Sequence, residues 1–172
     1  FSLMKPGDYL FIQFGHNDMK NKRPDALEHY KVDFKKVITG TRARGGTPVL
    51  VTSMERKAGV AHPTFEGYPE AVRQVAKEEH CPLIDLNEMS VVFYRALGTN
   101  LDKAFVDGTH HDNYGSYELA KCVVEGFKQN GLPLAKDIAG DFTRFDPARP
   151  DPVATFYMPA SPEYSMVKPP GN

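Results

Sequence analysis

Residues 8–18 read DYLFIQFGHND, and this stretch decides the fold that we expect. Asp8 to Phe14 forms a short, nearly continuous apolar run that follows a Pro-Gly pair and ends at Gly15. A run of this length between turn residues is typical of a strand that is buried on both faces of a parallel sheet. The sequence therefore predicts a buried strand here, followed directly by a polar loop.

Outward from this stretch, apolar runs alternate with segments of helical periodicity. Further strands are expected at 47–53 and 82–86. Helices are expected at 26–39, stopped by Gly40, at 70–80, at 89–97, ended by Gly98, and at 117–127. Strands that alternate with helices imply right-handed crossovers and a parallel sheet with helices on both faces. The predicted fold class is α/β.

Composition narrows the class of protein. The 172 residues are enough for one sizeable core, and the formal net charge of −1 gives no field that would attract nucleic acid. No stretch approaches the roughly 20 apolar residues that a membrane span requires. We therefore expect neither a nucleic-acid partner nor a membrane partner, and the sequence does not fix the oligomeric state.

The amino-acid composition changes after residue 139, where proline becomes frequent. We therefore expect two parts, an α/β domain at 1–139 and a tail at 140–172. Seven prolines at 147–170 exclude a regular helix in the tail. A disordered linker is one interpretation, but the tail is rich in aromatic residues, which favours a strap packed on the domain. These aromatic residues are Phe142, Phe145, Phe156, Tyr157 and Tyr164.

The two cysteines, Cys81 and Cys122, match no zinc-binding or CxxC spacing. The burial habit of cysteine favours two buried free thiols. A disulfide between them stays open, because only their geometry decides it.

The first polar motif, Gly15-His16-Asn17-Asp18, directly follows the first predicted strand. Ligands bind beyond the carboxyl ends of the strands in open parallel sheets, so the motif belongs to that edge. The side-chain NH2 of Asn17 could there donate to a developing oxyanion. An ordinary turn is the alternative, since Asn-Asp is common in turns.

The second motif, Asp107-Gly108-Thr109-His110, places an acid and an imidazole three residues apart in a loop. This spacing allows the carboxylate to hold one ring nitrogen while the other faces a substrate, as in a general base. The alternative makes Asp107 a turn residue and His110 an exposed cap.

Together the two motifs resemble the Gly-x-Asn-Asp and Asp-x-x-His blocks of SGNH (GDSL-type) hydrolases. Four further stretches resemble the rhamnogalacturonan acetylesterase branch of that superfamily. These are Lys5-Pro6-Gly7-Asp8-Tyr9, Gly67-Tyr68-Pro69, Pro82-Leu83-Ile84-Asp85-Leu86 and Tyr114-Gly115. The resemblance covers roughly residues 5 to 130.

The resemblance implies a flavodoxin-like, three-layer α/β/α serine esterase that acts outside the cell or in the periplasm and needs no metal or other cofactor. Its implied substrate is an acetylated plant cell-wall polysaccharide or oligosaccharide, from pectin or rhamnogalacturonan or from xylan. Asn17 would be an oxyanion-hole donor, His110 the general base and Asp107 its orienting carboxylate. His16 would contact the substrate.

One part of the family's pattern is missing from the chain. The blocks with the nucleophilic serine and the oxyanion-hole glycine precede Gly-x-Asn-Asp in the family, whereas residues 1–14 contain neither. The six serines, Ser2, Ser53, Ser90, Ser116, Ser161 and Ser165, stand in another order or setting. We therefore expect a nucleophile outside the 172 residues.

The flavodoxin-like strand order 2-1-3-4-5 leads to a related expectation about the sheet. The domain would be incomplete at its N-terminal side, without its first strands and nucleophile turn, and residues 8–14 would form an exposed edge strand. Pairing of residues 8–14 on both sides with strands of this chain would contradict this expectation.

Two other functions stay open. One is a non-catalytic carbohydrate-binding remnant of the same fold, since a base without a nucleophile offers little acyl-transfer chemistry. The other is a metal hydrolase, although the helix-borne HExxH pattern is absent. Its candidate ligands would be His16, Asp18, Asp107, His110, His111 and Asp112.

Overall fold

A computed structural model describes residues 1–158 of the chain. Within them, three parallel strands form one sheet in the order β1-β2-β3. Their bounds are Tyr9–Ile12 for β1, Thr47–Val51 for β2 and Leu83–Ile84 for β3. Each expected strand is present and shorter than its apolar run. The third is cut short because Leu86 already begins a helix.

Every expected helix is also present. The α-helices are α1 (Ala26–Arg42), α2 (Tyr68–Glu78), α3 (Leu86–Leu97) and α4 (Asn113–Gln129). Short 3-10 helices are η1 (Asp18–Lys20), η2 (Lys57–Val60), η3 (Gly98–Ala104), η4 (Pro133–Asp137) and η5 (Val153–Thr155). None of the helices in the described part of the chain has the length and apolar character needed to cross a membrane.

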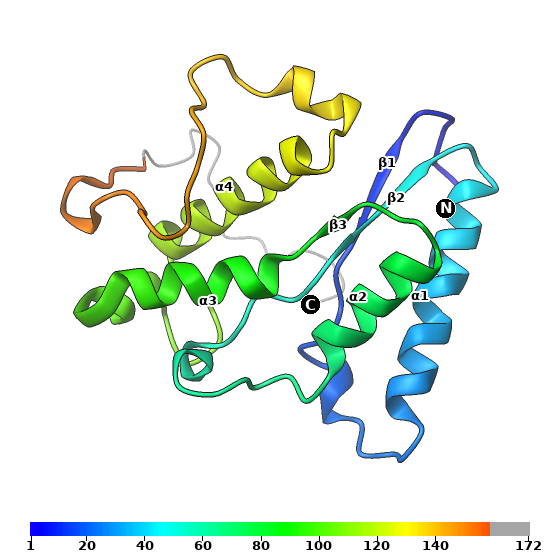
Figure 1. Ribbon diagram of the computed structural model, residues 1–172, viewed down its shortest axis with the longest axis horizontal. Helices are drawn as coiled ribbons and strands as arrows, with labels where there is room; N and C mark the ends of the chain where they lie inside the picture. The colour runs from blue at the N-terminus through cyan, green and yellow to red at the C-terminus, as the bar shows by residue number, and fades with distance from the viewer. Residues whose placement is uncertain (159–172) are drawn as a thin grey trace, which may run out of the picture.

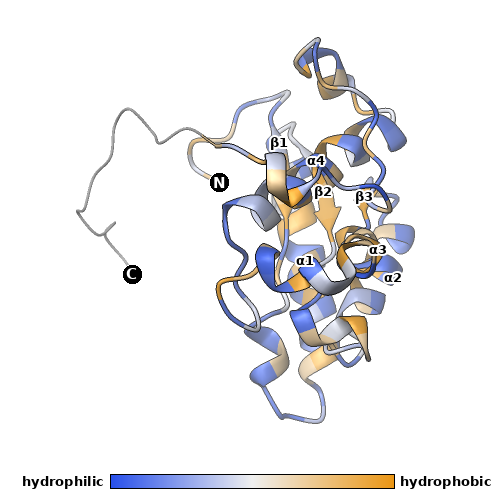
Figure 2. Cartoon of the chain, turned by 90° about the vertical axis from the view of Figure 1, so that its left-hand side faces the viewer, coloured by the Kyte–Doolittle hydropathy of each residue, from blue (hydrophilic) through white to orange (hydrophobic). Residues whose placement is uncertain are grey.

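The helices lie on both faces of the sheet, with α1 and α2 on one side and α3 and α4 on the other (Figure 1). Successive residues of β2 serve the two sides: Leu50 packs with Phe34 of α1, while Val49 packs with Phe93 of α3. The strands are accordingly hydrophobic along their length (Figure 2). The α/β class is confirmed, while the five-stranded flavodoxin-like order stays a prediction.

Strand β1 lies at an edge of the sheet, because β2 is its one strand partner among residues 1–158. The expectation that β1 is buried on both faces is wrong, because Ile12 is buried but Phe11 is 37% exposed. The Phe11 ring packs against Phe127 of α4 with ring centroids 5.2 Å apart. Pairing on both sides, which would have contradicted the expected edge, is not found in these residues.

Helix α1 corrects the expected stop at Gly40. The helix continues through this residue to Arg42, and the chain turns only at Gly45, where φ is +73°. Gly40 serves a close approach instead, because a Cβ atom there would lie 3.0 Å from the ring of Phe1. In contrast, Gly98 ends α3 as expected, with φ at +53°.

The tail runs back over α4. Phe142, Phe145 and Phe156 pack against the core that α3 and α4 share with the sheet, whereas Tyr157 is 83% exposed. These are the contacts that a strap would make. The boundary between residues 139 and 140 stays a prediction, and the rest of the tail, 159–172 with Tyr164, lies outside the described residues.

The two cysteines are free and lie on opposite sides of the sheet. Cys122 of α4 is completely buried, as expected, but Cys81 is only partly buried beside the α1 and α2 side. The sheet between them explains why they do not pair.

Candidate active site

The loop after β1 is fixed by contacts beneath its first turn. Gly15 adopts φ +145°, and a Cβ atom there would lie 2.7 Å from the Oγ of Ser53. The Phe14 carbonyl accepts hydrogen bonds from Ser53 Oγ at 2.8 Å and from Tyr30 Oη at 2.7 Å. Ser53 is buried and its hydroxyl donates to the Phe14 carbonyl, so this serine stabilises the loop.

Asn17 lies exposed on this loop, directly before η1. Its Oδ1 accepts a hydrogen bond from Lys20 Nζ at 2.7 Å. That bond fixes which side of the amide carries the NH2 group. Since the NH2 group has no partner among residues 1–158, it is available to an acceptor from a ligand.

Asp107 and His110 make the contact that their spacing predicts. Asp107 Oδ2 lies 2.7 Å from His110 Nδ1, and Oδ1 accepts hydrogen bonds from the backbone N–H groups of Thr109 and His110, each at 2.7 Å. These bonds hold the pKa of Asp107 well below its usual range. A charged carboxylate requires the proton on Nδ1, which leaves Nε2 as the free base.

The His110 loop is held from both ends. Val106 N–H donates to the His110 carbonyl at 2.8 Å, and Lys57 N–H donates to the Gly108 carbonyl at 3.2 Å. The loop leads into α4, whose first turn approaches the preceding chain so closely that a Cβ at Gly115 would lie 2.2 Å from the Ala104 carbonyl oxygen. Only glycine fits this position.

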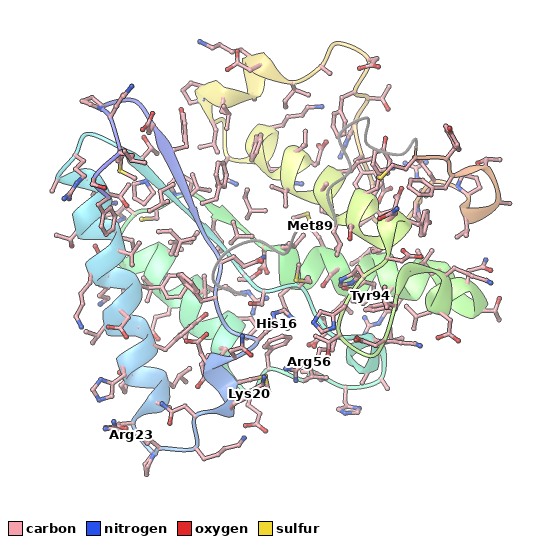
Figure 3. All side chains as sticks on the ribbon, turned by 180° about the vertical axis from the view of Figure 1, so that it is seen from behind. His16, Lys20, Arg23, Arg56, Met89 and Tyr94 are labelled. Carbon is pink, nitrogen blue, oxygen red and sulfur yellow. The ribbon has the colours of Figure 1, made fainter. Side chains whose placement is uncertain are left out.

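The two motifs meet at one hollow of about 550 Å³ at the carboxyl edge of the sheet. Six of the residues that line it bear on the site: His16, Asn17, Lys20, Arg56, His110 and His111. Asp107 stands beside the hollow and holds the ring of His110. Figure 3 shows His16, Lys20 and Arg56 gathered at this end of the molecule.

His16 is half-buried in the wall of the hollow. Its ring stands edge-on to Phe65, with ring centroids 4.7 Å apart. Burial, and next the charge of Arg56, lower the pKa of His16, so its ring is neutral around pH 7. A neutral imidazole in this wall offers a hydrogen bond rather than a charge.

His111 belongs to the site although the motif assigned it no role. Its Nε2 lies 2.7 Å from Tyr94 Oη, and the Tyr94 hydroxyl donates to the Glu55 carbonyl at 2.9 Å. Nε2 therefore carries the hydrogen of a neutral ring. Burial, with His16 next in size, lowers the pKa of His111 to about 4. Its position directly after the predicted base was the one signal for it in the sequence.

Arg56 was also missed. It follows β2 by five residues, at the same carboxyl edge as Asn17, so the rule that located Asn17 applies to it as well. The rule identifies only an edge of the sheet. It does not say which side chains of the segment after β2 face the hollow, so it did not single out Arg56.

No serine hydroxyl in residues 1–158 is hydrogen-bonded to His110. Ser90 donates to the Asn87 carbonyl at 2.7 Å and accepts from the Glu55 N–H. Ser116 lines the hollow from the first turn of α4 and has no side-chain hydrogen bond within the described residues. The nucleophile is thus not identified in this part of the chain.

Three of the candidate metal ligands, His16, His110 and His111, line the same hollow. The described residues contain no group of three or more His, Cys, Asp or Glu side chains placed to hold a metal ion.

A parallel α/β sheet whose carboxyl edge carries an acid–imidazole pair and a free amide group is typical of hydrolases that use general-base catalysis and oxyanion stabilisation. Residues 2–116 match the GDSL-like Lipase/Acylhydrolase family. The chain belongs to this family, the SGNH or GDSL-type ester hydrolases.

Two relatives from Bacillus subtilis (strain 168) are similar over most of the chain. The probable rhamnogalacturonan acetylesterase YesY is 35% identical over 79% of this chain and 69% of its own length. The rhamnogalacturonan acetylesterase RhgT is 34% identical over 74% of this chain and 64% of its own length. The chain thus spans about two thirds of these relatives.

Solved structures show the same fold. The crystal structure of YxiM from Bacillus subtilis superposes with a TM-score of 0.68 at 27% identity, over 75% of this chain and 39% of that one. A catalytic mutant of Axe2, an acetylxylan esterase from Geobacillus stearothermophilus, superposes with a TM-score of 0.56 at 19% identity, over 69% and 58% of the chains.

Proposed function

We propose that the protein is a serine-type carbohydrate esterase that hydrolyses acetyl esters on plant cell-wall polysaccharides, from pectin or rhamnogalacturonan or from xylan. The observation that carries this proposal is the pair of Asp107 and His110, 2.7 Å apart, at the hollow that Asn17 also lines. The names of the two Bacillus subtilis relatives support acetyl ester hydrolysis on such polysaccharides.

In the proposed reaction, His110 Nε2 takes the proton from a serine hydroxyl as the serine oxygen attacks the acetyl carbonyl carbon. The Asn17 NH2 donates to the oxyanion, a contact worth about 10²- to 10³-fold in rate when it is preorganised. The imidazolium, stabilised by Asp107, then protonates the sugar oxygen as the C–O bond breaks. Water, activated by His110, releases acetate from the acetyl-serine.

The nucleophile is a serine outside residues 1–172. His16 contacts the sugar from the wall of the hollow. The enzyme acts outside the cell or in the periplasm, where polymeric substrates are accessible, and fractionation of the source cells with an antibody to the protein tests this location.

The test measures acetate release from acetylated pectin and acetylated xylan by the intact gene product and its His110→Ala variant. Loss of the base is expected to lower kcat by about 10³-fold or more. His62→Ala is the matched control, because His62 is exposed and outside the hollow, and it should act like the unmodified protein. Unchanged turnover in His110→Ala would remove His110 from the mechanism.

One observation favours a second candidate, a non-catalytic carbohydrate-binding protein of the same fold. In the described residues His110 faces the hollow without a serine hydroxyl as its partner. Calorimetric binding of an acetylated oligosaccharide by the intact gene product, with no acetate released, would support binding alone and contradict the esterase proposal.

A further inference from the structure

Arg56 is held rigidly in the wall of the hollow. The residue is half-buried, its guanidinium carbon lies 5.2 Å from the centre of the Phe65 ring, and its Nη2 donates to the His16 carbonyl at 3.3 Å. A guanidinium held by an aromatic face and a carbonyl has lost most of its rotational freedom already. It is therefore preorganised for a ligand that enters the hollow.

The charge of Arg56 is not balanced within the described residues. No carboxylate among residues 1–158 forms an ion pair with it, whereas Arg73 lies 2.7 Å from Asp85. Its Nε is buried and has no hydrogen-bond partner in the described structure. A half-buried charge of this kind costs free energy that an entering anion would offset.

The nearest carboxylate in the sequence does not supply the missing charge. Glu55 is buried, and its two oxygens accept hydrogen bonds from the backbone N–H groups of Arg56 at 2.8 Å and of Thr64 at 3.1 Å. Its carboxylate is thus turned to the backbone. Close packing keeps it there, because a Cβ atom at Gly59 would lie 1.7 Å from its Cγ.

The rest of the hollow has the same electrostatic character. Lys20 also lines it, with its ammonium on the Asn17 amide oxygen at 2.7 Å and no carboxylate at ion-pair distance in the described part of the chain. No Asp or Glu lines the hollow. A ligand carboxylate would therefore meet two cations and no carboxylate among the residues that line the hollow.

We propose that Arg56 determines specificity for acidic sugars: its guanidinium binds the carboxylate of a uronic acid unit in the acetylated chain. This inference rests on the proposed esterase function and deepens it. The planar guanidinium matches a carboxylate through two parallel hydrogen bonds, which no hydroxyl group of a neutral sugar reproduces. Arg56 thus favours pectic chains, in which uronic acids recur, over neutral xylan chains.

The experiment compares two substrates that differ only in charge. An acetylated oligogalacturonide is assayed beside the same oligosaccharide after reduction of its carboxyl groups to alcohols and re-acetylation to equal content. We expect kcat/KM of the intact gene product to be about 10- to 100-fold higher on the acidic substrate, as for one charge-assisted contact. In Arg56→Gln this ratio should fall close to 1, mainly through KM.

Two further variants make the result specific. Arg56→Lys keeps the charge without the planar fork, so we expect an intermediate ratio, and it also serves if Arg56→Gln does not fold. Arg23→Gln removes an exposed arginine that pairs with Asp25 outside the hollow, and it should keep the full ratio.

The outcomes separate this inference from the proposed function. A ratio near 1 in the unmodified protein, or an equal loss on both substrates in Arg56→Gln, would overturn the role of Arg56 while acetate release still supports an esterase. If no acetate is released from either substrate, the proposed function fails. Calorimetry then decides on Arg56: tighter binding of the acidic oligosaccharide that is lost in Arg56→Gln supports it, and equal binding overturns it.

Discussion

At the scale of single residues, the Asp107 carboxylate divides its two oxygens between the backbone and the imidazole. Oδ1 accepts from two backbone N–H groups and Oδ2 from the ring of His110. The first oxygen fixes the loop and the second fixes the tautomer. The geometry of the base thus depends on one side chain.

Asp107→Asn tests this dependence. The amide keeps an oxygen for the backbone N–H groups but presents an NH2 to Nδ1, which forces the hydrogen onto Nε2 and removes the free base. We expect acetate release by the intact gene product to fall by about 10³- to 10⁴-fold with little change in fold. Asp102→Asn, which removes an exposed partner of Lys57, is the control. Near-normal activity in Asp107→Asn would contradict the role of the carboxylate.

His111 leads to a prediction about stability and pH. Its pKa is lowered to about 4 in the folded protein from 6.5, mainly by burial, so the unfolded chain binds the proton more tightly. The contribution of the neutral His111 ring to the free energy of unfolding is therefore fully present above about pH 6.5 and is lost as the pH falls toward 4. We expect a loss of about 1–2 kcal/mol, less than the full linkage value because the ring is only partly buried.

Urea unfolding at pH 7 and at pH 4.5 measures this loss. The comparison protein is His111→Phe, which keeps an aromatic ring between Tyr94 and Phe105 and has no proton to gain. His16, whose pKa is also lowered, contributes to both proteins, so the difference isolates His111. Equal pH dependence in the two proteins would show that His111 is not the group responsible.

At the scale of elements, the loop of the second motif depends on how α4 begins. Asp112 caps this helix through a hydrogen bond from the Gly115 N–H at 2.8 Å, and Gly115 lies against the Ala104 carbonyl. The loop with Asp107 and His110 lies between Ala104 and the cap. Its shape is therefore set by a helix start that admits only glycine.

Gly115→Ala should force these segments apart. The added methyl group would lie 2.2 Å from the Ala104 carbonyl oxygen, and we expect a loss of about 1–3 kcal/mol in the free energy of unfolding. Gly140→Ala, where nothing lies within 4 Å of an added Cβ, should change it by less than about 0.5 kcal/mol. Chemical denaturation checks both variants, and equal stabilities would mean that the backbone relaxes without cost.

The elements also show what the sequence predicts well. Apolar periodicity located every α-helix and strand of residues 1–158, because the spacing of apolar residues reflects which face of a helix or strand is buried, but it did not predict the five short 3-10 helices. The end of α1 was placed too early, at Gly40. This glycine is needed for close packing against the ring of Phe1, a residue 39 positions away in the chain. The prediction that β1 is fully buried was wrong, because the burial of a strand depends on which elements pack beside it.

The site divides in the same way. The location of Asn17 and the contact of His110 with Asp107 could be predicted because strand ends and a spacing of three residues are local features of the sequence, while their catalytic roles stay predictions. From the sequence, Arg56 had no place in the site and His111 only a place among candidate metal ligands, because the contacts that set these two residues apart depend on partners that are absent or distant. An arginine without a carboxylate partner looks like any other arginine in a sequence, and the bond from His111 to Tyr94 joins two separate elements.

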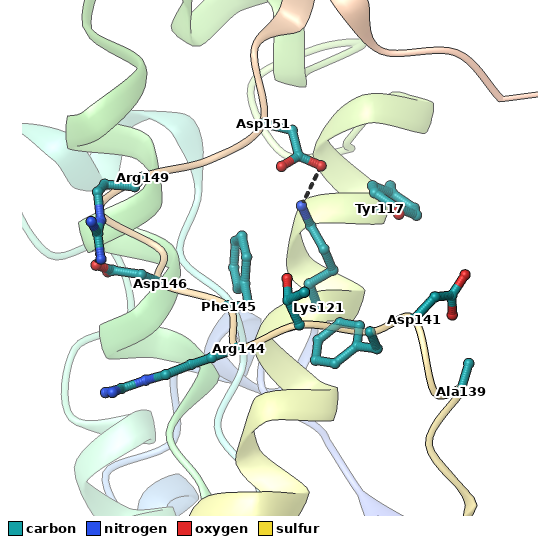
Figure 4. A pocket seen from close by; sticks show the side chains of 11 residues that line it. Tyr117, Lys121, Ala139, Asp141, Arg144, Phe145, Asp146, Arg149 and Asp151 are labelled. Carbon is teal, nitrogen blue, oxygen red and sulfur yellow. Dashed lines mark hydrogen bonds and ion pairs between the residues drawn. The ribbon is translucent and has the colours of Figure 1, made fainter.

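At the scale of the whole molecule, the sheet separates two cores of unequal construction. Helices α1 and α2, with Phe65 of the loop before α2, close one core against the sheet, whereas the core beneath α3 and α4 also includes Phe145 of the tail, which is only 8% exposed. Lys121 of α4 lies over the Phe145 ring at 4.4 Å and pairs with Asp151 at 2.7 Å (Figure 4). The tail thus completes a core that the helices leave open.

This arrangement predicts that truncating Phe145 destabilises the whole domain. Phe145→Ala removes a buried ring from a core and should lower the free energy of unfolding by about 3–5 kcal/mol. Tyr157→Ala, at a ring that is 83% exposed, should change it by less than about 0.5 kcal/mol. Urea denaturation followed by circular dichroism measures both. Were the tail a solvated linker, both variants would unfold like the unmodified protein, and the strap would have no part in the core.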